Sequence, residues 1–270
     1  MYVFVRKNGT WSQQAYIKAS NTKRFHFEGV DSGLGFGARL ALSADGNTLA
    51  VKAPYEPSGA TGIDGDQKDI SAPLSGAIYV FVRDGDAWRQ EAYIKSENSE
   101  ATGFGDPALS ADGDTLAVAH VGENVDPIYV YSRSEGIWAL QERLRTSHLG
   151  SERSFGGSAI ALSANGDVIA LGSPFDPSAA TGIGGDDQDT SAEASGAVHL
   201  FVRRSGNWEY AAYVKASNTD AGDLFGLRVA LSADASVMAV SAPNEASGAS
   251  GIGGDQTDNS LPRSGAVYLY

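Results

Sequence analysis

Acidic side chains recur at fixed positions in three glycine-rich segments. The segments read SGATGIDGDQKDIS at 58–71, SAATGIGGDDQDTS at 178–191 and SGASGIGGDQTDNS at 247–260. Closely spaced carboxylates, interleaved with glycines that let backbone carbonyls turn inward, can supply the roughly six to eight oxygen ligands of a calcium ion. We therefore predict Ca²⁺ as a cofactor. Its predicted ligands are Asp64, Asp66, Asp69, Asp186, Asp187, Asp189, Asp255 and Asp258.

A second interpretation of these acids is structural. Asp and Asn side chains accept hydrogen bonds from nearby backbone amides, which can order a long glycine-rich loop without an ion. Both interpretations stay open. A further acid precedes each segment, at Glu56, Asp176 and Glu245. We predict that these three acids share a ligand-binding face with Phe25 and Phe27, which lie in an insertion at 23–33.

Catalytic acids and bases are placed once, with neighbours that shift their pKa values. The acids of this sequence instead recur in register. The four histidines show neither the paired spacing of a zinc-binding helix nor a nucleophile motif. We therefore predict that the chain is not an enzyme and has no catalytic residue.

A repeat organises the whole sequence. ALSADGNTLAV at 41–51 returns as similar segments at 108–118, 161–171 and 230–240. Phe-Gly precedes each copy, and an apolar block such as SGAIYVFVR at 75–83 follows it, then a turn and a tryptophan. The alternation of apolar residues around Asp-Gly turns predicts two hairpins, and hence four strands, in each repeat. Four-stranded sheets in tandem must stack on one another to bury their faces, so we predict an all-β fold, a β-propeller of four-stranded antiparallel blades.

The repeats predict one propeller segment over residues 1–270. The strands, labelled a to d in each blade, run c-d, then three full sets, then a-b-c. Both ends of the sequence fall in strand c, so we expect an incomplete arc of a larger propeller, such as a seven-bladed one. The predicted blade boundaries are approximately 1–35, 36–103, 104–154, 155–224 and 225–270.

The charge of the chain limits its partners. Lys and Arg number 20 against 33 Asp and Glu, a net charge of −13. Residues 54–74, 174–194 and 243–263 contribute −3, −5 and −2 of that charge, and strand alternation predicts that these three loops between strands b and c share one face. Such a surface repels nucleic acid and anionic membranes. No apolar run approaches the ~20 residues that span a bilayer. We predict a protein or glycan ligand, with no nucleic acid and no membrane insertion.

These motifs resemble the FG-GAP repeats of the integrin α-subunit head. The Phe-Gly pairs match its "FG", and Lys52-Ala53-Pro54 and Ser241-Ala242-Pro243 match its "GAP". The resemblance implies an extracellular or cell-surface propeller. It does not extend to the calcium site that the family has in its a–b hairpin, because that hairpin is shortened here to Ser43-Ala44-Asp45-Gly46.

The function predicted from this resemblance is that of a ligand-binding or adhesion module. Two alternatives remain: a structural spacer, or an accessory part of a secreted carbohydrate-active hydrolase or lyase.

Overall fold

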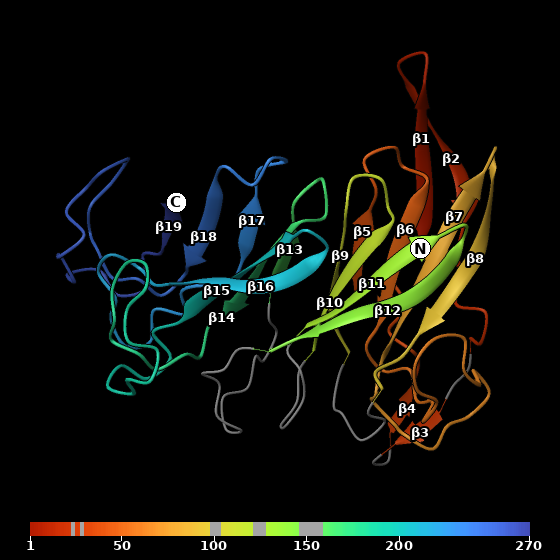
Figure 1. The fold of residues 1–270 in the computed structure, drawn as a ribbon, viewed down its shortest axis with the longest axis horizontal. Helices are drawn as coiled ribbons and strands as arrows, with labels where there is room; N and C mark the ends of the chain where they lie inside the picture. Colours follow the sequence, from red (N-terminus) through yellow and green to blue (C-terminus); the bar gives the residue numbers. More distant parts are fainter. Residues whose placement is uncertain (23–24, 28–29, 98–103, 121–127, 146–158) are drawn as a thin grey trace. The chain divides into compact units, whose positions relative to one another are not determined.

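The computed structural model describes residues 1–22, 25–27, 30–97, 104–120, 128–145 and 159–270, with the backbone alone for 25–27 and 30–32. Every regular element in these ranges is a β-strand (Figure 1). No helix that could span a membrane is found among them.

Nineteen strands are described in these ranges. They are β1 (Tyr2–Lys7), β2 (Thr10–Tyr16), β3 (Phe25–Phe27), β4 (Val30–Ser32), β5 (Arg39–Leu42), β6 (Thr48–Ala53), β7 (Ala77–Asp84), β8 (Ala87–Ile94), β9 (Phe104–Leu109), β10 (Thr115–His120), β11 (Ile128–Ser134), β12 (Ile137–Leu144), β13 (Ile160–Leu162), β14 (Val168–Ser173), β15 (Ala197–Arg204), β16 (Asn207–Val214), β17 (Val229–Leu231), β18 (Met238–Ala242) and β19 (Ala266–Leu269).

The strands form sheets in the order that the repeat predicts. Three sheets have four strands, β5-β6-β7-β8, β9-β10-β11-β12 and β13-β14-β15-β16, and β17-β18-β19 forms a three-stranded sheet. β1 and β2 form a hairpin before them. The prediction of an all-β fold with four-stranded antiparallel blades is confirmed. One element was not expected: the insertion at 23–33 contains a small hairpin, β3-β4.

Each a–b hairpin closes through a turn that begins Ser-Ala-Asp or Ser-Ala-Asn. Ser43 Oγ donates a hydrogen bond to Asp45 at 2.5 Å and accepts one from the Thr48 amide at 2.9 Å, and Gly46 has a φ of 71°. Ser110, Ser163 and Ser232 make the same pair of contacts in the other copies. The side chains of this motif therefore complete their own turns.

The contacts of the chain divide it into two compact units, which are treated separately below. The first comprises 1–118 and 131–141, and the second comprises 119–130 and 142–270. In the first unit β5, β6 and β7 contact β9 of the next sheet, and in the second β13 and β14 contact β17. Successive sheets thus pack on one another, as blades do.

The Phe-Gly pair is the point where one sheet docks on the one before it. Phe225 is fully buried, and its amide donates to the carbonyl of Ser195 at 3.0 Å. Phe104 makes the same contact with Ser75 at 3.2 Å. The approach is close: a Cβ added to Gly172 would lie 1.9 Å from the carbonyl oxygen of Gly226. Glycine is required there because no side chain fits.

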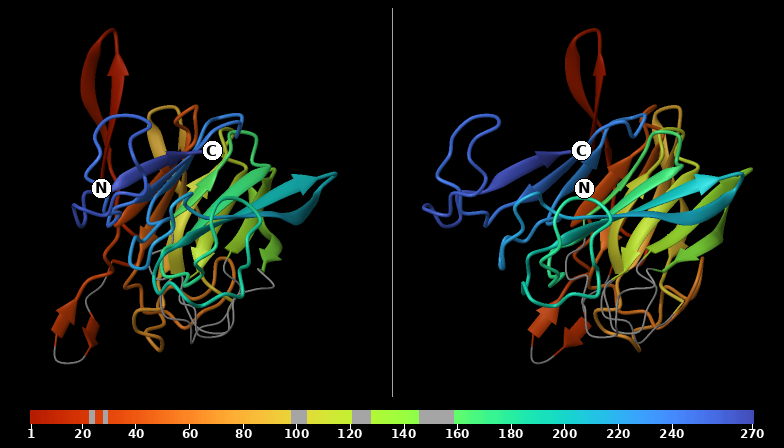
Figure 2. Two further views of the ribbon diagram at one scale, coloured as in Figure 1. Left: turned by 90° about the vertical axis from the view of Figure 1, so that its left-hand side faces the viewer. Right: turned by 60° about the vertical axis from the view of Figure 1, so that its left-hand side comes forward.

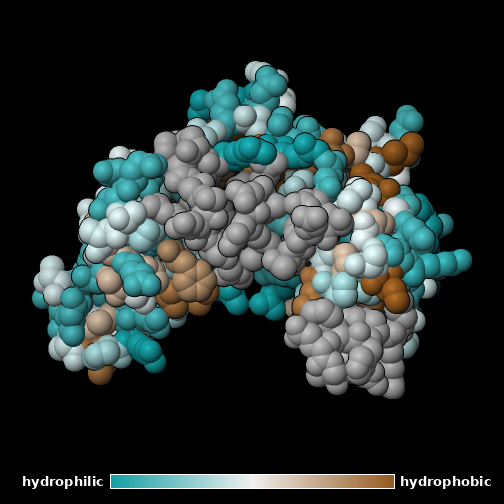
Figure 3. Space-filling model, turned by 90° about the horizontal axis from the view of Figure 1, so that it is seen from below, coloured by the Kyte–Doolittle hydropathy of each residue, from teal (hydrophilic) through white to brown (hydrophobic). Residues whose placement is uncertain are grey.

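The polar residues of the chain gather at its surface. Figure 3 shows one face, where hydrophilic residues predominate among those described and hydrophobic ones form small separate groups. The core consists largely of the inner strands, such as β6, β7 and β10, which are buried at consecutive positions. The b–c loops extend from the sheets, and the loop between β18 and β19 is visible in dark blue in Figure 2. These loops hold the acids singled out in the sequence.

Candidate functional site

A buried ion pair anchors two of the long b–c loops. Glu56 is fully buried and accepts hydrogen bonds from Lys95 Nζ at 2.8 Å and from the Ser58 amide at 3.0 Å. Lys95 directly follows β8 and also donates to Ser75 Oγ at 2.7 Å. A lysine at the end of the outer strand therefore neutralises the first acid of the loop.

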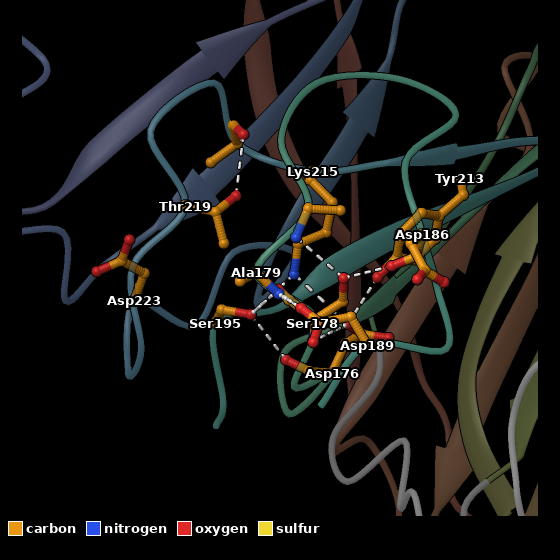
Figure 4. A network of polar contacts seen from close by, with 12 residues as sticks. Asp176, Ser178, Ala179, Asp186, Asp189, Ser195, Tyr213, Lys215, Thr219 and Asp223 are labelled. Carbon is orange, nitrogen blue, oxygen red and sulfur yellow. Dashed lines mark hydrogen bonds and ion pairs between the residues drawn. The ribbon is translucent and has the colours of Figure 1, made fainter. Parts of the chain in front are cut away.

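The second copy of this network repeats the first. Asp176 accepts hydrogen bonds from Lys215 Nζ at 3.4 Å, from Tyr213 at 2.7 Å and from the Ser178 amide at 3.0 Å (Figure 4). Lys215 also donates to Ser195 Oγ at 2.8 Å. Burial lowers the pKa of Lys215 to about 8, although the charge of Asp176 opposes this shift. Because the arrangement recurs and is closed to solvent, its role is structural.

The three acids predicted on a ligand-binding face are buried in the structure. Glu56, Asp176 and Glu245 are 0%, 1% and 3% exposed. The sequence places them at the start of a polar loop, which suggested exposure, but the folded chain brings a lysine or an asparagine amide onto each. The Phe25 and Phe27 side chains lie outside what the structure describes, and only their strand β3 can be placed.

The loop aspartates bind their own loops. Asp69 accepts hydrogen bonds from the Gly59 amide at 2.7 Å, the Ser71 amide at 3.0 Å and Ser71 Oγ at 2.7 Å. The Ser71 hydroxyl, with these amides, holds the pKa of Asp69 below its usual value. Asp66 accepts from the Lys68 amide at 2.8 Å. The corresponding acids make the same contacts in the other two loops: Asp186, Asp189, Asp255 and Asp258.

The two remaining predicted calcium ligands also have protein partners. Asp64 accepts a hydrogen bond from the Tyr93 amide at 2.8 Å, and Asp187 accepts one from the Gln188 side chain at 3.1 Å. Over the ranges that the structure describes, no three acidic or histidine side chains gather where they could hold a metal ion. This geometry fits the structural interpretation of the loops better than a calcium cage. The calcium and structural interpretations predict different effects of Ca²⁺ on the melting temperature, and the experiment that distinguishes them is given below.

The residues that differ between repeats indicate a candidate site around Asp223. In the first repeat Leu34 precedes the Phe-Gly region and is 4% exposed; in the last repeat the same position is Asp223, also 4% exposed. Asp223 Oδ2 accepts a hydrogen bond from the Asp220 amide at 3.1 Å. Burial raises the pKa of Asp223 to about 6, and the charges of Asp220 and Glu245 add to the shift while Lys215 opposes it. In Figure 4 its carboxylate lies apart from the Asp176–Lys215 network.

Three further departures from the repeat accompany Asp223. Asn244 stands where the other copies have Tyr55 and Phe175, Asn259 where they have Ile70 and Thr190, and Arg263 where they have Leu74 and Ala194. In the first copy the ring of Tyr55 lies against Gly35. The shorter Asn244 cannot fill that space, and its amide donates to the Gly222 carbonyl at 2.9 Å.

All four departures line one pocket. Its volume is about 570 Å³, and Asp223, Asn244, Asn259 and Arg263 line it together with Asp220. Asn259 donates to the Asp220 carboxylate at 2.9 Å. The pocket thus offers a carboxyl group that exchanges its proton near neutral pH, two amides that can bind hydroxyl groups, and a guanidinium group for a negative charge.

A second polar pocket is explained by structure alone. It has a volume of about 450 Å³ and contains Arg133, Glu91, Arg89 and Asp114. Glu91 accepts from Arg133 at 3.0 Å, from Arg89 at 3.0 Å and from Trp138 at 3.2 Å, and Arg133 also binds Asp114 at 2.6 Å. These charges satisfy one another, so the pocket of Asp223 is the better candidate site.

Sequence reasoning missed this site because it followed the acids that recur. The signal was present in the same alignment of repeats. A buried position has leucine in one copy and aspartate in another, and a nearby aromatic residue is replaced by asparagine. Such polar replacements reduce apolar packing and therefore indicate a candidate site. Only the fold shows that these positions, up to forty residues apart in the sequence, line one cavity.

Comparison with known proteins finds solved structures of low similarity and no family. No protein-family model and no curated protein matches the sequence. Among solved structures, a putative 6-phosphogluconolactonase from Bacteroides uniformis is 14% identical, with 99% of this chain and 67% of that chain covered and a TM-score of 0.44. TolB from Acinetobacter baumannii is 14% identical, with 86% and 40% covered and a TM-score of 0.41. The periplasmic gluconolactonase of Pseudomonas aeruginosa is 14% identical, with 75% of this chain and 64% of that chain covered and a TM-score of 0.34.

Two predictions from the sequence are wrong in the light of these findings. Membership of the FG-GAP family is contradicted, because no family model matches and the similar structures are TolB and lactonase propellers. The prediction that the chain is not an enzyme is contradicted by the lactonases among them. This chain spans 40% of the length of TolB and 41% of a selenium-binding protein from Sulfolobus tokodaii. At this low similarity the comparisons assign no activity to the chain.

Proposed function

We propose that the pocket around Asp223 binds a small polyhydroxylated molecule and hydrolyses a reactive ester bond within it, such as that of a sugar lactone. One observation supports this proposal above all: Asp223, Asn244, Asn259 and Arg263, each different from its counterparts in the other repeats, line a single pocket. The other copies have Leu34, Thr102 and Arg153 at the position of Asp223, so a carboxylate stands there in the last repeat alone.

The roles of the residues follow from their chemistry. Asp223, ionised above its pKa of about 6, accepts a proton from a water molecule, and the water oxygen attacks the carbonyl carbon. Arg263 stabilises the negative charge that develops on the carbonyl oxygen. The ring C–O bond then breaks, and the leaving oxygen takes the proton back from Asp223. Asn244 and Asn259 orient the hydroxyl groups of the ligand.

The rate enhancement that one acid–base group can supply favours a reactive ester over a glycoside as the substrate. A single positioned acid–base group contributes roughly 10²–10⁴-fold to a rate. Glycoside hydrolysis requires two carboxylates on opposite sides of the bond. Asp220 and Asp223 lie on one short segment and are joined through the Asp220 amide, and Asp220 is engaged by Asn259. A lactone, whose ester already reacts slowly with water, needs no more than the single acid–base group and the guanidinium that this pocket offers.

The experiment measures hydrolysis of an aldonolactone panel, with the uncatalysed rate subtracted. We expect Asp223→Asn to lower kcat/KM by at least about 100-fold, and Arg263→Lys to lower it about tenfold. Glu193→Gln is the matched control, since Glu193 is an exposed acid of the same unit, and it should stay within about twofold. Unchanged rates in Asp223→Asn, or no turnover of any member of the panel, would contradict the proposal.

The cellular setting remains a proposal as well. We propose an extracytoplasmic location, in line with the extracellular or cell-surface placement expected from the sequence, and a glycan-related ligand in preference to a protein. Fractionation of the native source with antibodies against this chain tests the location. Recovery in the cytoplasmic fraction alone would contradict it.

A further inference from the structure

The chain contains two Asn-Gly dipeptides, and both lie in hairpin turns. Asn8-Gly9 joins β1 to β2, at the tip of the hairpin drawn in red in Figure 1, and Asn165-Gly166 lies between β13 and β14. In such a dipeptide the backbone nitrogen of glycine can attack the side-chain amide carbon of asparagine, because glycine has no side chain to obstruct the approach. The two turns differ in whether the reacting groups are held by other residues.

The reacting groups of Asn165-Gly166 are both held within their turn. Asn165 Oδ1 accepts hydrogen bonds from Ser163 Oγ at 2.7 Å and from the Asp167 amide at 3.1 Å, and Asn165 Nδ2 donates to Asp167 Oδ2 at 3.0 Å. The Gly166 amide, which contains the attacking nitrogen, donates to the Ser163 carbonyl at 3.0 Å. These four hydrogen bonds must break or rearrange before the dipeptide can react.

The same groups are uncommitted in the turn of Asn8 and Gly9. Both residues are exposed, and their φ angles are 50° and 81°, as in a two-residue type I′ hairpin turn. Among the residues that the structure describes, neither the Asn8 side chain nor the Gly9 amide has a hydrogen-bond partner. The Gly9 carbonyl accepts from Arg6 Nε at 3.4 Å, and this contact involves neither reacting group.

The exposure of this turn recurs in the four-stranded sheets. The turn residues Glu135-Gly136 and Ser205-Gly206 are also exposed, with φ angles of 52° and 78° and of 50° and 86°. The turn between β7 and β8, at Gly85-Asp86, is exposed as well. Among these four turns, the first is the one that has an asparagine before its glycine.

We propose that Asn8 is a site of spontaneous modification, at which its side-chain amide is lost while that of Asn165 is kept. The Gly9 nitrogen forms a bond to Asn8 Cγ, the bond from Cγ to Nδ2 breaks, and the leaving nitrogen takes the Gly9 amide proton and departs as ammonia. Water then opens the cyclic imide. Cleavage of the imide bond at Cγ gives aspartate, and cleavage at the main-chain carbonyl gives isoaspartate, in which the backbone runs through Cγ.

Either product changes the surroundings of Lys7. Lys7 Nζ pairs with Asp86 at 3.2 Å, and Gln14 donates to the same carboxylate at 3.0 Å, so these contacts join the first hairpin to the turn between β7 and β8. A new carboxylate at position 8 competes for Lys7. Isoaspartate also lengthens the backbone of a two-residue turn, which the pair Lys7 and Thr10 closes. The modification therefore alters this contact as the protein ages.

Peptide mapping of the intact chain tests the assignment. The folded protein is incubated at mildly alkaline pH and then digested, and mass spectrometry measures the conversion of amide to acid in the peptides that contain Asn8 and Asn165. We expect Asn8 to convert at least about tenfold faster than Asn165, because local opening must precede reaction at Asn165. Equal rates, faster conversion at Asn165, or no conversion at Asn8 would overturn the proposal.

Two comparisons assign the difference to the turns themselves. Ser163→Ala removes a hydroxyl that holds Asn165 and should raise the conversion rate of Asn165 at least about fivefold, with that of Asn8 unchanged and a melting curve confirming that the variant is folded. In denaturant the two dipeptides of the wild-type chain should convert within about threefold of each other, because the contacts that distinguish them are gone. A tenfold difference that persists in denaturant, or an Asn165 rate that Ser163→Ala leaves unchanged, would overturn it.

Discussion

Leu34 and Asp223 occupy corresponding positions with opposite chemistry. Both are 4% exposed, but leucine gains free energy from burial whereas a carboxylate loses solvation. The pKa of Asp223 rises to about 6 as a result. Retaining an acid at this position lowers stability at neutral pH, which is the usual relation between a reactive group and the fold that holds it.

Asp223→Leu is therefore expected to stabilise the protein in a pH-dependent way. A folded-state pKa raised from 3.8 to about 6 means that the folded chain binds more protons between these values, so stability from this group is present below about pH 4 and lost as pH rises through 6. At pH 7.5 the loss amounts to at most about 3 kcal/mol. Urea unfolding at pH 4.0 and 7.5 measures the gain.

The reciprocal change, Leu34→Asp, provides the control. It places an acid at the apolar position of the first repeat and should lower the free energy of unfolding at pH 7.5 more than at pH 4.0. If Asp223→Leu gave the same gain at both pH values, the raised pKa would be refuted.

The buried pair of Lys215 and Asp176 gives a second prediction at this scale. Lys215→Met leaves the Asp176 carboxylate buried without its cation and should cost about 3–5 kcal/mol at pH 7. The double variant Lys215→Met, Asp176→Asn should cost less than Lys215→Met alone, because no charge is left unpaired. Chemical unfolding of the three proteins measures this coupling, and strictly additive costs would show that the pair does not act as a unit.

At the scale of elements, the repeat predicted most of the fold. Period-2 alternation and Asp-Gly turns act over a few residues, so β5-β6, β13-β14 and their copies could be placed from sequence alone. The environment of Glu56 could not, because its partner Lys95 follows a different strand, 39 residues away. The site around Asp223 could not be predicted for a similar reason: its members are distant in sequence and differ from the residues that recur in the repeats.

Close packing between sheets makes Gly172 sensitive to substitution. Gly172→Ala would place a methyl group 1.9 Å from the Gly226 carbonyl oxygen, and β14 and the Phe225-Gly226 segment must separate to admit it. We expect a loss of at least about 1–3 kcal/mol in the free energy of unfolding. Gly33→Ala, with nothing within 4 Å of the added carbon, should change stability by less than about 0.5 kcal/mol. Comparable losses in both variants would argue against this account of the docked sheets.

The b–c loops allow the calcium prediction to be tested directly. Since their aspartates already accept hydrogen bonds from loop amides and hydroxyls, we expect the melting temperature in excess Ca²⁺ to match that in chelator within about 1 °C. A rise of several degrees that disappears in Asp189→Asn would instead support calcium binding. Asp189 is suited to this test because its partner amide, Ala179, lies on the far side of the same loop.

At the scale of the whole molecule, the polar residues that recur in the b–c loops differ in role from those that break the repeat. The three loops hold −10 of the net charge of −13, yet the recurrent carboxylates of these loops bind their own backbone or a buried lysine. The residues that break the repeat around Asp223 instead line a pocket. In a protein built from copies, regularity maintains the fold, and departures from it identify the place where function was added.

A crystal structure of the chain soaked with gluconate, a polyhydroxylated acid that resembles the product of lactone hydrolysis, tests this claim most directly. The account predicts electron density in the pocket of Asp223, with the gluconate carboxylate at Arg263 and hydroxyl groups at Asn244 and Asn259. An empty pocket, or gluconate bound at the recurrent aspartates of the b–c loops, would contradict it.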